Sequence, residues 1–257
     1  MVDALKKRLG TLALLLSITG CSSVSIEYDR MTGTAFPPAQ TVAGQTVTIA
    51  SIYGKAGYLV QVKEDETNIP ALIGTVSMTD PDQFDYITEA ELDTLEQRHR
   101  GSPVGPTSAV CFRAALLPTF CQTYYIYGIV VNHWYENNDG KRDQDILGKM
   151  WATTDRRAFA NFYKSSVNNT DGGRFLRSTA HEIGHAFNLH HEDGDGKTDI
   201  MNQTWKVGLR YVFAFVAAAS TDHLIKHDAN CRWPGMSKFG AVHTDHVDHG
   251  WESATCP

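Results

Sequence analysis

The segment His181-Glu182-Ile183-Gly184-His185 places two imidazoles and a carboxylate within one short stretch of chain. In a helix, residues four apart share one face, so the two histidines can donate nitrogens to a single metal ion. Glu182 is offset by one position, so its carboxylate can instead reach a water bound to that ion. Such a water has a lowered pKa, and a nearby carboxylate can take its proton during attack on a carbonyl. The segment therefore predicts metal-assisted hydrolysis, with His181 and His185 as ligands and Glu182 as general base.

A catalytic zinc ion needs a third protein ligand. The glutamates that follow the motif are Glu192, which is too close for a ligand carried by a second helix, and one in the C-terminal tail. His191 is better placed if the helix ends near Asn188, because asparagine accepts the left-handed conformation that such a turn needs. The alternatives are His190 and the aspartates of the next loop, Asp193, Asp195 and Asp199.

These residues resemble the metzincin pattern, which is HExxHxxGxxH followed by a methionine in a tight turn. The three histidines and Glu182 match in register, Asn188 stands where glycine is usual, and Asp199-Ile200-Met201-Asn202 resembles the methionine turn. The resemblance implies one catalytic Zn²⁺ held by His181, His185 and His191, with Met201 packed beneath the ligands. It also implies an α/β (α+β) zincin domain with a mixed twisted sheet, an active-site helix and a C-terminal helix.

Several segments would have to position these residues. Asp171-Gly172-Gly173 is expected to open the active-site helix. Residues 146–152 and 158–163 have strand composition, and by the same resemblance Leu147 to Ala152 is the candidate edge strand that binds extended substrate. The alternative is that this strand is central. The remaining expected elements are strands at 46–51, 58–62, 109–117 and 124–132, a helix from Thr88 to Arg100 with a Thr88/Glu91 capping box, and an apolar helix at about 209–227.

The N-terminal residues resemble a bacterial lipoprotein signal peptide. Lys6-Lys7-Arg8 precede an apolar run from Leu9 to Ile18 that is too short to span a bilayer, and Ile18-Thr19-Gly20-Cys21 resembles a lipobox. The resemblance implies cleavage before Cys21 and a lipid on this residue, which would anchor the protein to the outer membrane in a bacterial cell envelope. An ordinary secretory signal is the alternative. We expect a signal peptide at 1–20, a tether at 21–43 and one catalytic domain at 44–257.

The other four cysteines are even in number, which in an exported protein predicts two disulfides. Closeness in sequence favours the pairs Cys111–Cys121 and Cys231–Cys256 among three connectivities. The chain has no CxxC pair, so a cysteine-rich zinc site is not expected.

Composition restricts the partners. The net charge of −6 offers no basic face, so nucleic acid is not expected, and a hydrophobic fraction of 42% is typical of a soluble globular domain, expected here as a monomer. The acidic loops at 136–145 and 193–199 could bind calcium, but Lys197 stands where a ligand would be wanted, and solvated loops are favoured. The His-rich tail at 231–257 is interpreted as a surface segment, with secondary metal binding as the alternative.

We therefore expect a zinc-dependent endopeptidase that acts on a peptide or protein substrate. The alternative function is that of a non-catalytic surface lipoprotein that binds metal or a partner and keeps a relic zinc site. Glu182 argues against this alternative, because a relic site has no need of a general base.

Overall fold

The computed structural model describes most of the chain between residues 23 and 214. The described ranges are 23–70, 86–103, 107–112, 118–132, 134–136, 142–143, 146–151, 156–165, 167–189, 191, 199–203 and 213–214. Among these residues no helix is both long and apolar enough to cross a membrane.

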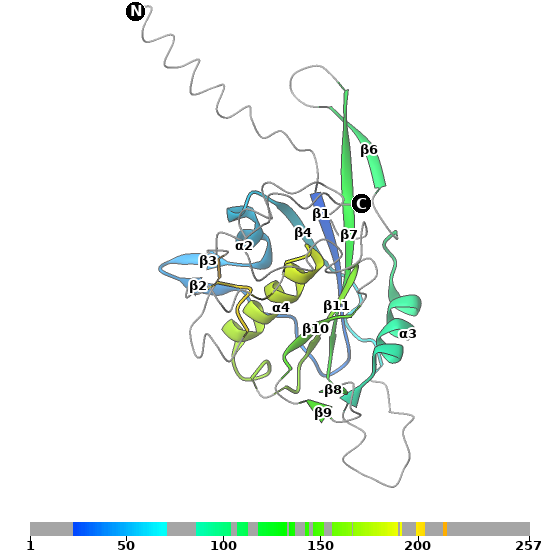
Figure 1. The fold of residues 1–257 in the computed structure, drawn as a ribbon, viewed down its shortest axis with the longest axis vertical. Coiled ribbons are helices and arrows are strands. Elements are labelled where there is room, and N and C mark those ends of the chain that lie inside the picture. The colour runs from blue at the N-terminus through cyan, green and yellow to red at the C-terminus, as the bar shows by residue number, and fades with distance from the viewer. Residues whose placement is uncertain are drawn as a thin grey trace, which may run out of the picture.

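The fold is mixed α/β, as predicted (Figure 1). The strands are β1 (Ser23–Arg30), β2 (Gln40–Val42), β3 (Gln45–Val47), β4 (Leu59–Glu64), β5 (Tyr86–Ile87), β6 (Thr107–Phe112), β7 (Pro118–Val131), β8 (Trp134–Glu136), β9 (Arg142–Asp143), β10 (Gly148–Met150) and β11 (Ala158–Phe162). The described helices are α2 (Ile49–Lys55), α3 (Glu89–His99) and α4 (Gly172–Ala186).

The main sheet has the strand order β10-β11-β7-β1-β4, and β6 pairs with the first part of β7. Strands β11, β7, β1 and β4 are parallel, whereas β10 is antiparallel to β11 and β6 is antiparallel to β7. Smaller sheets are formed by β2 with β3 and by β5, β8 and β9. Strand β10 ends the order, so the prediction of an edge strand within Leu147 to Ala152 is confirmed.

Strand β1 corrects the predicted tether. Residues 23–30 lie between β4 and β7 near the middle of the sheet, with Ser23 opposite both Leu59 and Thr123. Val24, Ile26 and Tyr28 are fully or almost fully buried. Their alternation with polar residues is the period-two pattern of a strand, so the folded domain begins at least twenty residues earlier than the predicted boundary at 44.

The predicted strand at 46–51 is also only partly correct. Strand β3 ends at Val47 and α2 begins at Ile49. The Thr48 hydroxyl accepts from the Ser51 N–H, and the Ser51 hydroxyl accepts from the Thr48 N–H, which forms a capping box.

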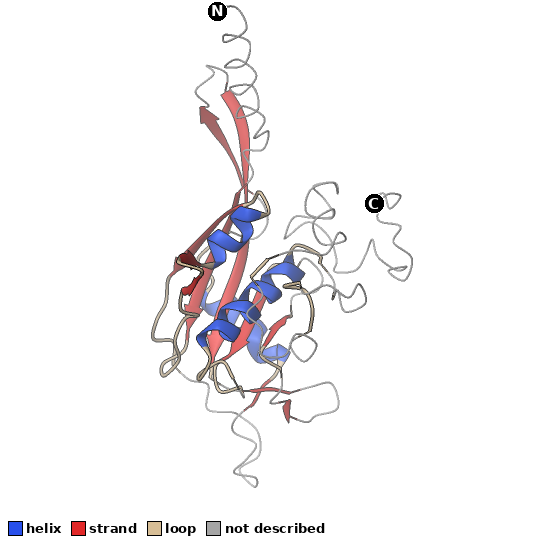
Figure 2. Cartoon of the chain, turned by 90° about the vertical axis from the view of Figure 1, so that its left-hand side faces the viewer, coloured by secondary structure: helices blue, strands red, loops and turns tan. Residues whose placement is uncertain are grey.

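The two faces of the sheet carry separate cores (Figure 2). Helices α2 and α4 cover one face, where Tyr53, Phe175 and Ile183 pack against Ile26 and Phe159. Helix α3 covers the other face, packing its leucines against the opposite side of β7 and β11. Since successive residues of a strand point to opposite faces, both cores draw on the same strands.

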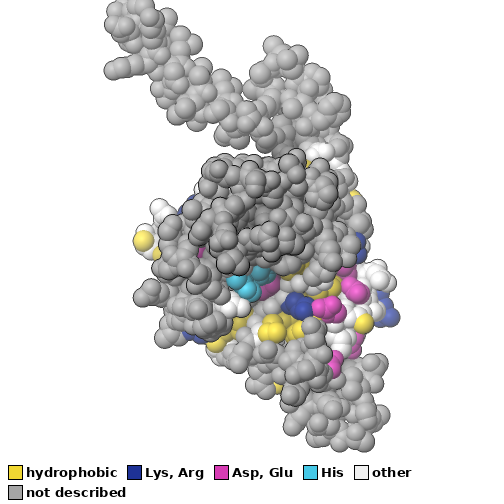
Figure 3. All heavy atoms as spheres, viewed as in Figure 1, with side chains coloured by type: hydrophobic (Ala, Val, Ile, Leu, Met, Phe, Trp, Pro, Cys, Tyr) yellow, Lys and Arg dark blue, Asp and Glu magenta, His cyan; other side chains and the backbone are white. Residues whose placement is uncertain are grey.

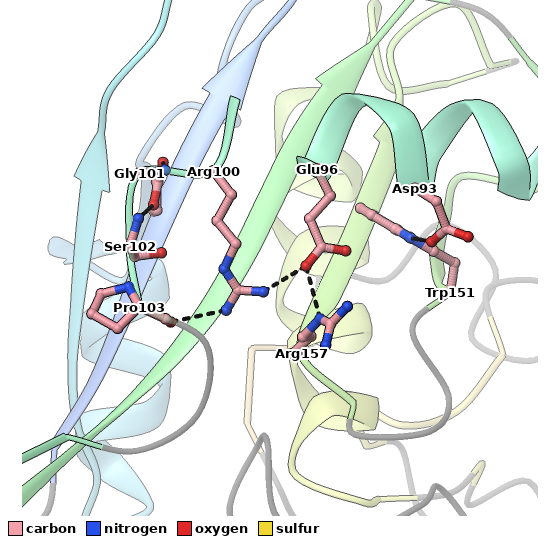
Figure 4. A network of polar contacts seen from close by, with 9 residues as sticks. Asp93, Glu96, Arg100, Gly101, Ser102, Pro103, Trp151 and Arg157 are labelled. Carbon is pink, nitrogen blue, oxygen red and sulfur yellow. Dashed lines mark hydrogen bonds and ion pairs between the residues drawn. The ribbon is translucent and has the colours of Figure 1, made fainter. Parts of the chain in front are cut away.

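Helix α3 begins as predicted, because Thr88 and Glu91 form the expected capping box. Its Glu96 is buried and accepts from Arg100 at 2.5 Å and from Arg157, which precedes β11, at 2.8 Å (Figure 4). Asp93, one turn earlier, accepts from the indole N–H of Trp151 at 3.0 Å. These contacts fasten α3 to the segments that flank β10 and β11.

Other predictions lie outside the described residues. These are the signal peptide, Cys21, the His-rich tail, and Cys231 and Cys256. Of the predicted helix at 209–227 the structure describes Phe213 and Ala214, which are not helical, and the Ala214 carbonyl accepts from the Ile200 N–H. The backbones of β6 and β7 place Cys111 opposite Thr119 and Cys121 opposite Ala109, so the two cysteines are not directly opposed. Both disulfides stay predictions.

Candidate metal centre

Helix α4 carries the HExxH segment and is almost entirely buried. It begins where predicted, because the Asp171 carboxylate accepts from the N–H groups of Gly173 at 3.1 Å and Arg174 at 3.0 Å. A carboxylate at this position caps the first turn and favours the positive end of the helix dipole. The cap sets where the helix begins, and the helical repeat then places His181 and His185 on one face.

The chain turns back directly after α4, as the asparagine predicted. Asn188 is buried and has a φ of 66°, the left-handed conformation. The turn brings the Leu189 carbonyl within 2.7 Å of His185 Nδ1 and the Leu189 N–H within 3.0 Å of the Gly184 carbonyl. His185 is thereby oriented by the end of its own helix, and the chain continues toward His191.

Three histidines converge at this end of α4. His181 Nε2 lies 3.1 Å from His185 Nε2 and 3.1 Å from His191 Nε2. Nitrogens bound at about 2.0–2.1 Å to one tetrahedral ion lie about 3.3 Å apart, so this spacing fits a shared zinc ion. His181 is buried, His185 is partly buried and His191 is exposed. Histidine side chains accordingly reach the surface on the face drawn in Figure 3.

The charge state of His181 suits a ligand. Burial lowers the pKa of His181 well below its usual range, and the neighbouring His185, His191 and Arg177 act in the same direction. Its Nδ1 lies 2.8 Å from the Ile200 carbonyl, which can only accept, so Nδ1 carries the proton. The Nε2 lone pair is therefore available to a metal.

Met201 packs against the same helix. It is fully buried, and a Cβ placed on Gly184 would overlap its sulfur. The turn that carries it is closed by its own side chains, since Asp199 Oδ1 accepts from the Met201 N–H at 2.8 Å and Asn202 Oδ1 accepts from the Asp199 N–H. The absence of a side chain at Gly184 is what lets this turn lie directly beneath His181 and His185.

Glu182 is held by the edge strand. Its Oε2 accepts from the Met150 N–H of β10 at 2.9 Å. Burial raises the pKa of Glu182 to about 8, while this hydrogen bond and the charges of Lys149 and Arg177 act in the opposite direction. The groups that lower the pKa favour the ionised carboxylate, which is the form that accepts a proton as a general base.

Gly148 makes room for this carboxylate. A Cβ at this position would lie 2.7 Å from Glu182 Cγ and 2.7 Å from Asn161 Nδ2, closer than real Cβ contacts. Strand β10 therefore holds Glu182 in two ways: the Met150 N–H donates to its carboxylate, and Gly148 leaves space for its side chain.

Of the alternative third ligands the structure describes Asp199, which is not part of the group. Asp199 is fully buried in the turn of Met201, and among the described residues the histidine group comprises only His181, His185 and His191. His190, Asp193 and Asp195 lie outside the described residues.

Three residues that hold α4 or the turn beneath it in place carried no signal in the sequence. Tyr53 of α2 donates to the Ala180 carbonyl at 2.7 Å, Arg156 donates to the Ala186 carbonyl at 2.8 Å, and Arg177 donates to carbonyls of the Met201 turn. All three are buried. Each bonds a main-chain oxygen far along the chain or at a helix end, a relationship that only tertiary structure defines.

A second group of carboxylates, Glu27, Asp29 and Asp65, lies on the α3 side of the sheet. Glu27 already accepts from the N–H groups of Gly101 at 2.7 Å and Ser102 at 2.6 Å, and Asp29 accepts from the Glu66 N–H at 2.9 Å. These bonds give the two buried acids a structural role in joining β1 to the segments beyond α3 and β4.

Comparison with known proteins gives a distant resemblance. No protein-family model and no curated protein sequence matches the chain. Among solved structures, it is similar to the crystal structure of a zinc-dependent peptidase from Methanocorpusculum labreanum (strain Z), with 15% sequence identity and a TM-score of 0.44. The similarity covers 79% of this chain and 100% of that chain. At this distance, the interpretation of the site rests on its own geometry, which is a three-histidine group able to hold a metal ion beside a buried carboxyl group.

Proposed function

We propose that the protein is a zinc-dependent endopeptidase of the metzincin type, with His181, His185 and His191 as ligands and Glu182 as general base. The observation that carries the proposal is the convergence of three Nε2 atoms beside a buried carboxyl group held by the edge strand. Among the described residues the group has three imidazole ligands and no fourth, which matches a catalytic zinc site more closely than a structural one, which is closed by four protein ligands.

The metzincin assignment is supported by details outside the HExxH segment. Asn188 adopts the left-handed turn that lets His191 return to the helix, and Met201 packs against Gly184 beneath the histidines. The third ligand follows the second by a short turn within one chain segment, as in the HExxHxxGxxH pattern.

Within this proposal different residues bind the metal, transfer the proton and orient the substrate. Bound zinc would lower the pKa of its water and polarise the scissile carbonyl. Glu182 takes the proton of the attacking water and returns it to the leaving amine, held in place by the Met150 N–H. Among the described strands β10 ends the sheet, and an extended peptide paired with its outer edge would be oriented together with the base.

We also propose that the protein is a lipid-anchored monomer of a bacterial cell envelope, on the outer membrane. The support is the lipobox-like Ile18-Thr19-Gly20-Cys21 after a basic and apolar segment. Because β1 begins at Ser23, a lipid on Cys21 would hold the catalytic domain directly at the bilayer with no intervening tether.

Peptide cleavage by the wild-type protein tests the proposed activity. Protein loaded with one equivalent of zinc is incubated with a broad peptide library in ¹⁸O water, and the products are analysed by mass spectrometry. We expect internal cleavage with ¹⁸O in the new carboxyl group, loss of cleavage on chelation, and recovery on return of zinc. A zinc-loaded protein that cleaves no peptide, but retains a binding partner, would support the non-catalytic alternative.

A further inference from the structure

Arg177 is a buried charge one helical turn before the first histidine of the motif. It is 2% exposed, and its Nη2 donates to the Ile200 carbonyl at 3.1 Å and to the Asn202 carbonyl. These two carbonyls flank Met201 in sequence, so one guanidinium binds the turn on both sides of the methionine.

The Ile200 carbonyl is shared with a metal ligand. It accepts from Arg177 and also from His181 Nδ1, at 2.8 Å. Arg177 and His181 lie four residues apart on α4 and therefore on one face. Gly184, against which Met201 packs, continues this face. The turn thus docks on α4 at three successive positions, through a guanidinium, an imidazole and a glycine.

The two helical histidines depend on different parts of the chain. His185 Nδ1 bonds the Leu189 carbonyl, four residues later, so its partner is supplied by the end of its own helix. The partner of His181 lies 19 residues away, beyond the loop that follows His191. The orientation of His181 is therefore only as well defined as the docking of the 199–202 turn onto α4.

A charged side chain is an unexpected choice for this docking if stability alone is considered. Burying a guanidinium carries a desolvation penalty, and an apolar side chain of similar size often serves a packed interior equally well or better. Two hydrogen bonds from Arg177 to main-chain oxygens fix the position of the turn relative to the helix more closely than an apolar contact can.

We propose that Arg177 is a positioning residue of the metal centre: it fixes the 199–202 turn on α4, so that the Ile200 carbonyl sets the tautomer and ring orientation of His181. This inference rests on the proposed zinc site. It assigns to Arg177 no contact with the metal or the substrate, only the placement of the group that orients a ligand.

The test compares Arg177→Met and Arg177→Lys with Arg156→Met. Arg156 is a matched control, because it is fully buried and donates to a carbonyl of α4 itself, that of Ala186. Zinc affinity is measured by chelator competition, the ligand field by the absorption spectrum of the Co²⁺-loaded protein, and folding by circular dichroism and the melting temperature.

We expect Arg177→Met to weaken zinc binding by about 10–100-fold and to change the Co²⁺ spectrum. Arg177→Lys should recover part of the affinity, since an ammonium can donate to one or both carbonyls without the planar fork. Arg156→Met should lower the melting temperature while keeping wild-type affinity and spectrum.

The proposal is overturned if folded Arg177→Met binds zinc within twofold of wild type with the same Co²⁺ spectrum, or if Arg156→Met loses as much affinity. If Arg177→Met does not fold, Arg177→Lys decides, and unchanged affinity there overturns it. If neither folds, Arg177 serves the fold and the proposal fails. Because these readouts need no peptide, a wild-type protein that binds zinc but cleaves nothing would refute the proposed activity and leave this inference standing.

Discussion

The two helices that cover opposite faces of the central sheet are held by different kinds of polar contact. The site residues of α4 bond to the main chain: Glu182 to the Met150 N–H, and His181 and Arg177 to the Ile200 carbonyl. The buried acid of α3 bonds to side chains instead, since Glu96 accepts from Arg100 and Arg157 (Figure 4).

This difference follows from the residues that each helix carries, which are the proposed site on α4 and a structural contact on α3. A main-chain partner is placed by the fold and keeps its chemistry when its own side chain is substituted, so it holds a catalytic group in a fixed geometry. A side-chain partner secures one element to another but can be exchanged. We therefore expect substitutions on the α4 face to affect metal binding and cleavage, and substitutions on the α3 face to affect stability.

The largest effect on cleavage is expected from removal of a ligand. His191→Ala should reduce peptide cleavage and zinc affinity by more than about 100-fold, beyond the range of a residue that only supports a ligand. His190→Ala is the control, because the converging group contains His191. Equal losses in the two variants, measured by chelator competition and initial rates, would show that the third ligand is wrongly assigned.

A smaller effect is expected from crowding the base. Gly148→Ala places a methyl group against Glu182 Cγ and should lower kcat by about 10–100-fold through displacement of the carboxylate, while zinc stays bound. Gly54→Ala, in α2 with open space around its Cα, should leave kcat unchanged. Loss of zinc together with kcat in Gly148→Ala would mean that β10 supports the metal rather than the base.

On the opposite face, Glu96→Gln should destabilise the protein without altering the chemistry. It leaves two arginines without their shared carboxylate, which should lower the free energy of unfolding by about 3 kcal/mol in urea titration. The folded variant should keep its kcat/KM within about twofold. A large fall in kcat/KM at unchanged stability would erase the distinction between the two faces.

The smallest effect is a pH dependence of stability from Asp29. Burial raises the pKa of Asp29 to about 6, and the charges of Glu27 and Glu66 act in the same direction. The folded state then holds this proton more tightly than the unfolded state, so stability should fall by about 2 kcal/mol as pH rises from about 4 to about 6. Asp29→Asn keeps the acceptor for the Glu66 N–H and should flatten this part of the profile. An unchanged pH profile in the variant would assign the effect to another group.

Much of the site could be predicted because its determinants are local. The cap at Asp171, the helical spacing of His181 and His185, and the left-handed Asn188 each depend on a few adjacent residues. The same holds for the Thr88/Glu91 capping box of α3.

The features that the sequence did not predict depend on contacts between residues far apart in the chain. Strand β1 has a clear alternation of Val24, Ile26 and Tyr28, but its polar Glu27 and Asp29 also lie buried. Their donors are N–H groups at 101, 102 and 66, which no local pattern reveals. In the same way, the sequence around Arg177 does not indicate its contacts, because its acceptor lies in the distant 199–202 turn.

In the proposed site three histidines bind the metal, while Glu182, which is not a ligand, transfers the proton. The most direct measurement is zinc stoichiometry together with peptide cleavage in Glu182→Gln, which nearly preserves the shape of the side chain. We expect this variant to bind one zinc ion with affinity close to wild type and to lose cleavage by at least about 100-fold. Cleavage that persists in the zinc-loaded variant would contradict the role of Glu182 as general base. Loss of zinc in the variant would show that Glu182 supports the metal.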